Sequence, residues 1–197
     1  MRQRSVLITI LQLFLLLLPL DATAAEMRAD RVPNETLYIV RVNGAIEKRD
    51  DQKFIDLVAR LPLLFVIVIF NSPGGELSSA LAIGHEIKIR GLSTAVEAGA
   101  VCASACALAW LAGDTRYMEA SSKIGFHAAY VRQGQTEVEK GEANAVVGAY
   151  LNQLGLSSDA IRYITRAPPS GVQWLSIRHS MTLGINVTIP SEVSPSR

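Results

Sequence analysis

A glycine-rich turn, a serine and a histidine follow one another in an order that suits acyl-transfer chemistry. Residues 71–75 are Asn-Ser-Pro-Gly-Gly, Ser104 is the centre of Cys-Ala-Ser-Ala-Cys, and His127 follows Gly-Phe. Acyl transfer needs a nucleophile, a base that accepts its proton, and N–H donors for the oxyanion. We therefore take Ser104 as the candidate nucleophile, His127 as the candidate base, and the glycine turn as a source of donors.

Each of these motifs also has a purely structural explanation. Gly-Gly is common where a strand turns into a helix, and a serine at a helix start is often an N-cap. The other histidines, His85 and His179, are weaker candidates for the base, because each lies in an expected helix beside a charged residue. The run around Ser104 also lacks the glycines of the G-x-S-x-G nucleophile elbow. The order and spacing of the three motifs support the chemistry more than any one motif does.

The expected elements around these motifs alternate between strand and helix. Residues 63–70 are apolar throughout, as in a strand that is buried on both faces of a parallel sheet. Residues 76–90 show helical periodicity after the glycine turn, and residues 103–112 form a helix of small residues around the serine. Residues 136–154 are expected to be the longest helix. This alternation predicts a single α/β domain.

The N-terminal segment of the sequence predicts export. Residues 1–25 have a short basic lead, an uncharged and mostly apolar run, and small residues that a signal peptidase accepts. We expect a flexible, irregular leader over residues 26–35, the domain over residues 36–190, and a tail over residues 191–197. The alternative is an uncleaved membrane anchor, although the apolar run is short for a bilayer-spanning helix. Either way, the domain is expected in the periplasm or outside the cell.

Composition limits the partners. The chain has 19 Lys and Arg against 18 Asp and Glu, with 49% hydrophobic residues. No basic stripe with interleaved aromatic residues occurs, so we expect no nucleic-acid partner. The proposed chemistry requires no metal or other cofactor.

The two cysteines flank the candidate nucleophile. Cys102 and Cys106 are four residues apart, and in an oxidising compartment they could pair. Within one regular helix their side chains would point in unsuitable directions. If Cys102 lies in a turn just before a helix that carries Cys106, a disulfide becomes feasible. The sequence leaves both states open.

Taken together, the motifs resemble those of the Clp-type serine peptidases. The resemblance rests on Asn-Ser-Pro-Gly-Gly, on Ser104 within Ala-Ser-Ala 29 residues after Gly75, and on His127 after Ile-Gly-Phe 23 residues later. The resemblance covers residues 37–189. Within this family, the chain is most similar to exported relatives in which Cys-x-Ser-x-Cys surrounds the nucleophile. The resemblance implies a ClpP/crotonase-like fold of stacked β-β-α turns. It also implies Ser104 as nucleophile, His127 as base, the amides of Gly75 and Ala105 as oxyanion hole, and a homo-oligomer assembled through residues 136–154.

One member of the family's triad has no counterpart. Clp-type enzymes carry an Asp just ahead of the segment that here is Trp-Leu-Ser at residues 174–176, where this chain has Ser-Gly-Val-Gln. Asp159 is the nearest upstream acid, and its place at a helix start explains it without catalysis. A backbone carbonyl, Ser170 or Gln173 are the remaining candidates to orient His127.

Three functions are consistent with the sequence. The first is an exported serine peptidase acting on peptides or proteins without an ATPase partner, because the periplasm lacks ATP. The second is a binding or assembly module that kept the fold and lost the complete triad. The third, acyl-coenzyme A chemistry of the crotonase kind, fits poorly with an exported chain and a Ser-His pair. We favour the peptidase.

Overall fold

Five strands form the main sheet, in the order β1-β2-β3-β4-β6. The structure is a computed structural model, and it describes residues 24–62, 65–133 and 136–190. All neighbouring pairs in this sheet are parallel except β1 with β2. The strands are β1 (Glu26–Arg31), β2 (Leu37–Asn43), β3 (Phe65–Asn71), β4 (Ser93–Val96) and β6 (Arg116–Met118). The carboxyl end of β3, where the glycine turn begins, therefore lies among parallel strand ends.

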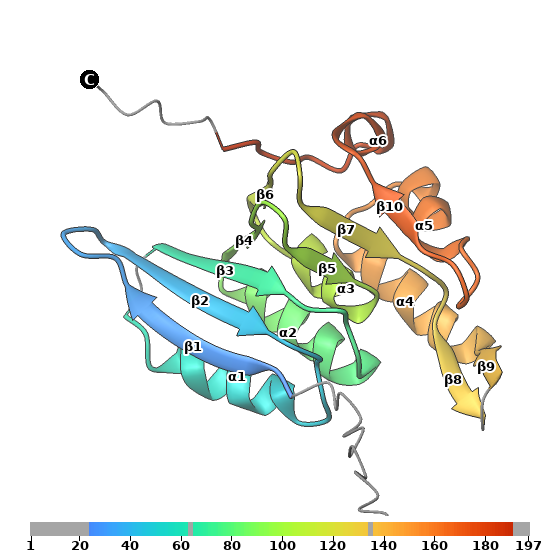
Figure 1. The fold of residues 1–197 in the computed structure, drawn as a ribbon, viewed down its shortest axis with the longest axis horizontal. Coiled ribbons are helices and arrows are strands. Elements are labelled where there is room, and N and C mark those ends of the chain that lie inside the picture. Colours follow the sequence, from blue (N-terminus) through green and yellow to red (C-terminus); the bar gives the residue numbers. More distant parts are fainter. Residues whose placement is uncertain (1–23, 63–64, 134–135, 191–197) are drawn as a thin grey trace, which may run out of the picture.

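A smaller sheet carries the segments on either side of the candidate nucleophile and base. Its order is β10-β7-β5, with β5 (Val101–Ala103) parallel to β7 (Lys123–Phe126) and β10 (Gln173–Leu175) antiparallel to β7. Ser72, just past the end of β3, forms a bridge with Cys102 in β5. The end of β3 thus passes from the main sheet to the edge of the smaller one (Figure 1).

The helices follow the strands in repeated turns. β4 in the main sheet is followed by β5 in the smaller one and then by α3 (Ala105–Leu111), and β6 is followed by β7 and later by α4 (Gly141–Gln153). Figure 1 shows α1 (Asp50–Ala59) and α2 (Leu77–Ile89) together on one face of the main sheet. The chain ends with α5 (Ser158–Thr165) and α6 (Ile177–Leu183). This is the expected α/β arrangement of stacked β-β-α turns.

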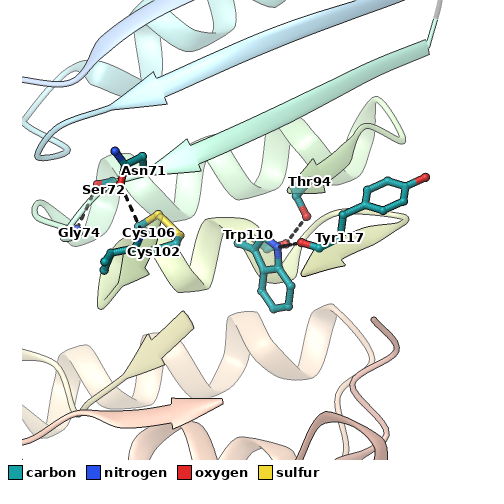
Figure 2. The surroundings of a disulfide bond; sticks show 9 residues. Asn71, Ser72, Gly74, Thr94, Cys102, Cys106, Trp110 and Tyr117 are labelled. Atoms are coloured by element: carbon teal, nitrogen blue, oxygen red, sulfur yellow. Dashed lines mark hydrogen bonds between the residues drawn. A yellow bond between two sulfur atoms is a disulfide. The ribbon is translucent and has the colours of Figure 1, made fainter. Parts of the chain in front are cut away.

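Helix α3 is the centre of the core. All seven of its residues are buried, and it packs against α2, β5 and β7. Thr94 Oγ1 donates to Trp110 O at 2.8 Å, and Trp110 Nε1 donates to Tyr117 O at 3.3 Å (Figure 2). These contacts fix the far end of α3 in the core.

The prediction of an irregular leader is wrong for residues 26–31. They form β1, which pairs antiparallel with β2 from Glu26 opposite Asn43 to Arg31 opposite Tyr38. The sequence of β1 is polar because it is an edge strand, with four of its six residues exposed. Backbone pairing, which places no demand on side-chain polarity, holds it to the sheet.

The prediction of one long helix over residues 136–154 is also wrong in its first part. β8 (Tyr130–Gln133) and β9 (Thr136–Glu139) form an antiparallel hairpin, and α4 begins only at Gly141. The hairpin extends away from the two sheets in Figure 1. Lys140 N donates to Ala129 O at 3.0 Å, which closes the hairpin just before the helix.

The expected signal peptide over residues 1–25 and the expected tail over residues 191–197 lie almost wholly outside the described residues. Within the ranges given above, no helix combines the length and apolar character needed to cross a membrane.

Candidate active site

One pocket of about 490 Å³ brings the predicted site residues together. Ser104, Ala105, Gly75 and His127 all line it, although they come from different parts of the chain. Ser104 and Ala105 lie where β5 becomes α3, Gly75 lies between β3 and α2, and His127 follows β7. The remaining lining residues are mainly apolar: Ala45, Pro73, Gly74, Leu77, Leu108, Ala129, Tyr130 and Val147.

Ser104 occupies the N-cap position of α3, but its side chain does not cap the helix. Its backbone has φ 55° and ψ −128°, and its hydroxyl makes no capping hydrogen bond. A non-glycine residue rarely adopts such a positive φ, at a cost of about 1–3 kcal/mol. Ser104 lines the pocket, and among the described residues its hydroxyl makes no hydrogen bond. The structural explanation that Ser104 is an ordinary N-cap is therefore not supported.

Neighbouring backbone holds Ser104 in this conformation. Ser104 N donates to Gly125 O at 2.8 Å in β7, and Ala103 N donates to Ser72 O at 3.1 Å. A Cβ atom on Gly74 would lie 2.7 Å from Ser104 Cβ and 2.6 Å from Ala103 O. Only glycine allows the turn to approach the serine this closely.

The same turn supplies a candidate oxyanion donor. Gly75 has φ 141°, and a Cβ there would lie only 2.0 Å from Ile46 O. Gly74 O accepts from Ile46 N at 2.8 Å, and Ile46 O accepts from Glu76 N at 2.7 Å. These bonds fix the turn and leave the N–H of Gly75 without an acceptor among the described residues. The N–H of Ala105 also has no acceptor there.

Glu76 stabilises the helix that follows the turn. Its carboxylate accepts hydrogen bonds from Ser78 N at 3.1 Å and Ser79 N at 2.6 Å, at the start of α2. Partial burial alone would raise the pKa of Glu76, but the hydrogen bonds from Ser79 and Ser78 outweigh it and lower the pKa below its usual value. The ionised cap therefore anchors the end of the Gly-Gly turn.

Cys102 and Cys106 form a disulfide in the structure, with their Cα atoms 5.3 Å apart. Figure 2 shows the bond beside Ser72 and the end of β3. Cys102 belongs to β5 and Cys106 to the first turn of α3, so the two are not in one regular helix. This is the arrangement in which the sequence allowed a bridge.

His127 is half-buried directly after β7, and its orientation is set by backbone. Its Nδ1 lies 2.8 Å from Ala128 O. With the proton on Nδ1, the ring donates to this carbonyl and Nε2 keeps a free lone pair. Ala128 N donates to Ala167 O at 2.8 Å, which ties the segment to the end of α5. In the part of the chain that the structure describes, no hydrogen bond joins Ser104 to His127.

The side chains considered for the third position lie elsewhere. Gln173 Oε1 accepts from Arg166, and Gln173 Nε2 lies 3.1 Å from Tyr163 Oη. Asp159 pairs with Arg162 on the exposed side of α5. Ser170 is exposed in a turn. Of the candidates, the backbone carbonyl of Ala128 is the one that contacts the imidazole.

Two neighbours of His127 were missed by sequence reasoning. The ring of Tyr130 lies with its centroid 5.4 Å from that of His127 and lines the pocket. Asn144 in α4 accepts from Ala129 N through Oδ1 at 2.7 Å, which holds the segment after the histidine. An asparagine in a helix gives no sequence signal of this role. Tyr130, an aromatic residue three positions after His127, gave a weak signal.

The described ranges contain no group of three or more His, Cys, Asp or Glu side chains placed to hold a metal ion.

Comparison with known proteins finds likeness only at the level of structure. No family model matches the sequence, and no curated protein matches it. Among solved structures, a serine-to-alanine variant of the 1510-N membrane-bound stomatin-specific protease superposes with a TM-score of 0.60 at 15% identity, covering 80% of each chain. A lysine-to-alanine variant of that protease, in complex with a substrate peptide, gives 0.62 at 15% identity, covering 82% of this chain and 78% of the other.

A third structure comes from the Clp peptidases themselves. ClpP1 from Listeria monocytogenes, as an asparagine-to-aspartate variant, superposes with a TM-score of 0.59 at 19% identity, covering 77% of this chain and 90% of that one. Identities this low establish the fold and not the activity. The two sheets, the stacked β-β-α turns and these likenesses together show that the chain has the fold of the Clp-type serine peptidases.

Proposed function

We propose that the protein is an exported serine peptidase that uses Ser104 as nucleophile and His127 as general base. The observation that carries the proposal is the state of Ser104. Its backbone is held at a positive φ, its hydroxyl is not used as a cap, and it shares a pocket with His127. A serine kept in a costly conformation without a structural bond is expected where the hydroxyl reacts.

The geometry supports a two-step acyl transfer. Ser104 Oγ attacks the peptide carbonyl while His127 Nε2 accepts the hydroxyl proton, and the N–H groups of Gly75 and Ala105 stabilise the oxyanion. His127 then protonates the leaving amine, and water hydrolyses the acyl-enzyme by the reverse sequence. Ala128 O holds the imidazole in the required tautomer. A carbonyl oxygen carries no full negative charge, unlike the carboxylate of a complete triad, so we expect slower turnover than with such a triad.

The pocket favours apolar peptide side chains. The side chains around Ser104 that could contact a substrate include Leu77, Leu108 and Val147, and none of the residues lining the pocket is an acid, a lysine or an arginine. Burying an uncharged side chain there would gain apolar contact without desolvating a charge. We expect small, flexible or unfolded substrates and no ATPase partner.

Export and assembly form part of the proposal. The signal-like pattern of residues 1–25 and the disulfide both suit an oxidising compartment such as the periplasm. Val146 in α4 is 51% exposed, and α4 follows the projecting hairpin. An exposed apolar side chain on this surface supports a homo-oligomer assembled through the hairpin and α4. Light scattering would measure the mass of that oligomer.

Labelling with a fluorophosphonate probe tests the nucleophile. We expect wild type to form a covalent adduct and Ser104→Ala to form none, with peptide hydrolysis reduced by roughly 10⁴-fold or more. Ser176→Ala is the matched control, because Ser176 also precedes a helix but caps it, and it should label like wild type. An unlabelled wild type, or equal labelling of Ser104→Ala, contradicts the assignment.

A binding or assembly module is the second candidate. It is favoured by the lack of a carboxylate on His127 and of a Ser104–His127 hydrogen bond in the described residues. Apo geometry is often looser than that of the substrate complex. A protein that binds unfolded peptides equally well with Ser104 or Ala at this position, and never cleaves them, would be such a module.

A further inference from the structure

We propose that the Cys102–Cys106 disulfide is a positioning element that holds the peptide between Ser104 and Ala105 in the orientation needed for the oxyanion hole. The inference rests on the proposed function, because it gives a role to the bridge around the same nucleophile. Neither cysteine is a catalytic residue. Both sulfur atoms act through the backbone that they constrain.

The bridge spans the site of unusual backbone conformation. Cys102 lies two residues before Ser104 and is anchored in β5, between Ser72 and Ile124 of β7. Cys106 lies two residues after Ser104, in the first turn of α3. The covalent link therefore ties the strand that enters the turn to the helix that leaves it, with Ser104 at the midpoint.

Global stabilisation is a poor explanation for this bridge. A disulfide restricts the unfolded chain more when it closes a longer loop, and this one joins residues only four apart. Both cysteines are fully buried, in a helix and strand that are already packed on several sides. The main effect of so short a loop is to limit the local backbone angles, which here are those of residues 103–105.

The peptide that carries the Ala105 N–H has few other restraints. Its N–H has no acceptor among the described residues, and its carbonyl, Ser104 O, accepts one hydrogen bond, from Ala107 N at 3.0 Å. A rotation of this peptide would reverse the direction of its N–H and would change ψ of Ser104, which is −128° in the structure. The bridge opposes that rotation, because it fixes the separation of the flanking residues at 102 and 106.

The test compares Cys102→Ala/Cys106→Ala and Cys102→Ser/Cys106→Ser with wild type. We expect the maximal rate of fluorophosphonate inactivation to fall at least 10-fold, while the concentration for half-maximal rate changes less than 3-fold. A merely structural bridge would leave both constants unchanged once the protein is folded. Thr94→Val is the matched control, because it removes the buried bond to Trp110 O at the far end of α3. It should lower the midpoint of thermal unfolding without lowering the inactivation rate.

A second readout does not depend on activity. In crystal structures of the two double variants, we expect ψ of Ser104 to leave the region of −128° in at least part of the molecules. If wild type does not react with the probe, the proposed function fails and the value of ψ at Ser104 still decides the inference. An unchanged ψ with an unchanged rate overturns the inference, and so does complete unfolding of both variants, which would show a global role.

Discussion

Helices α3 and α6 both begin after a serine, but the two serines do different things. Ser176 has an extended backbone at φ −104°, and its Oγ accepts from His179 N at 3.1 Å. Ser104 has φ 55°, and its hydroxyl makes no such bond. At α6 the side chain satisfies the helix start, whereas at α3 the surrounding backbone of Ser72, Gly74 and Gly125 determines the conformation. The same residue at the same helix position becomes a cap or a free hydroxyl according to its neighbours.

The largest predicted effect removes the neighbour of Ser104. In Gly74→Ala the new Cβ would meet Ala103 O at 2.6 Å at a φ of 99°. We expect a loss of about 3 kcal/mol or more in the free energy of unfolding, from clash plus strain, together with loss of probe labelling. Gly155→Ala is the control, because Gly155 has φ 80° with nothing within 4 Å of the added Cβ. Gly155→Ala should lose only the stability that backbone strain costs. Equal losses in the free energy of unfolding for Gly74→Ala and Gly155→Ala, measured by urea denaturation, would contradict the role of close packing at Gly74.

The next effect concerns the cap. Ser176→Ala removes the hydrogen bond to His179 N and should lower the free energy of unfolding by about 1 kcal/mol. Ser104→Ala removes no capping bond, so its stability should stay within about 0.5 kcal/mol of wild type. Chemical denaturation of the two variants checks the contrast. A larger loss for Ser104→Ala would mean that the hydroxyl supports the fold after all.

A third variant tests the strain at α3 directly. Ser104→Gly should be more stable than Ser104→Ala by about 1 kcal/mol, because glycine adopts positive φ without the penalty that a Cβ imposes. At Ser176, where φ is −104°, glycine should also be more stable than alanine, but only by the difference between the two residues as N-caps. Thermal unfolding of the four variants gives the comparison, and equal stabilities at position 104 would rule out strain there.

The smallest effect distinguishes a charged cap from an uncharged one. The hydrogen bonds to Glu76 hold its pKa below its usual value in the folded protein, so its contribution to stability is present above the unfolded pKa and is lost as pH falls through the folded pKa. We expect the stability difference between wild type and Glu76→Gln to shrink, by at most about 1 kcal/mol, between pH 5 and pH 3. The Ser176 cap does not titrate, so the effect of Ser176→Ala should not change over this range. An unchanged Glu76→Gln difference would show that the carboxylate is not the cap in solution.

Sequence patterns predicted much of the fold because burial leaves a clear signature. The unbroken apolar run before residues 71–75 indicated a central parallel strand, and β3 is that strand. The pattern was misleading where backbone pairing replaces apolar contact. Residues 26–31 are too polar to suggest a strand, and residues 136–139 have helix-like spacing but pair in a hairpin.

For the candidate site, the sequence by itself determined which residues were available and in what order. Residue types and spacing pointed to Ser104, His127 and the glycine turn, the resemblance to Clp-type peptidases implied Gly75 and Ala105, and all four residues line the pocket. Only the tertiary structure decided how Ser104 is held, that Cys102 and Cys106 are bonded, and that Ala128 O contacts His127. These depend on backbone directions set by contacts between distant segments, such as Ser72 with Cys102 and Ser104 with Gly125. A local pattern cannot specify such contacts, because each requires two chain segments to be placed against each other by the whole fold.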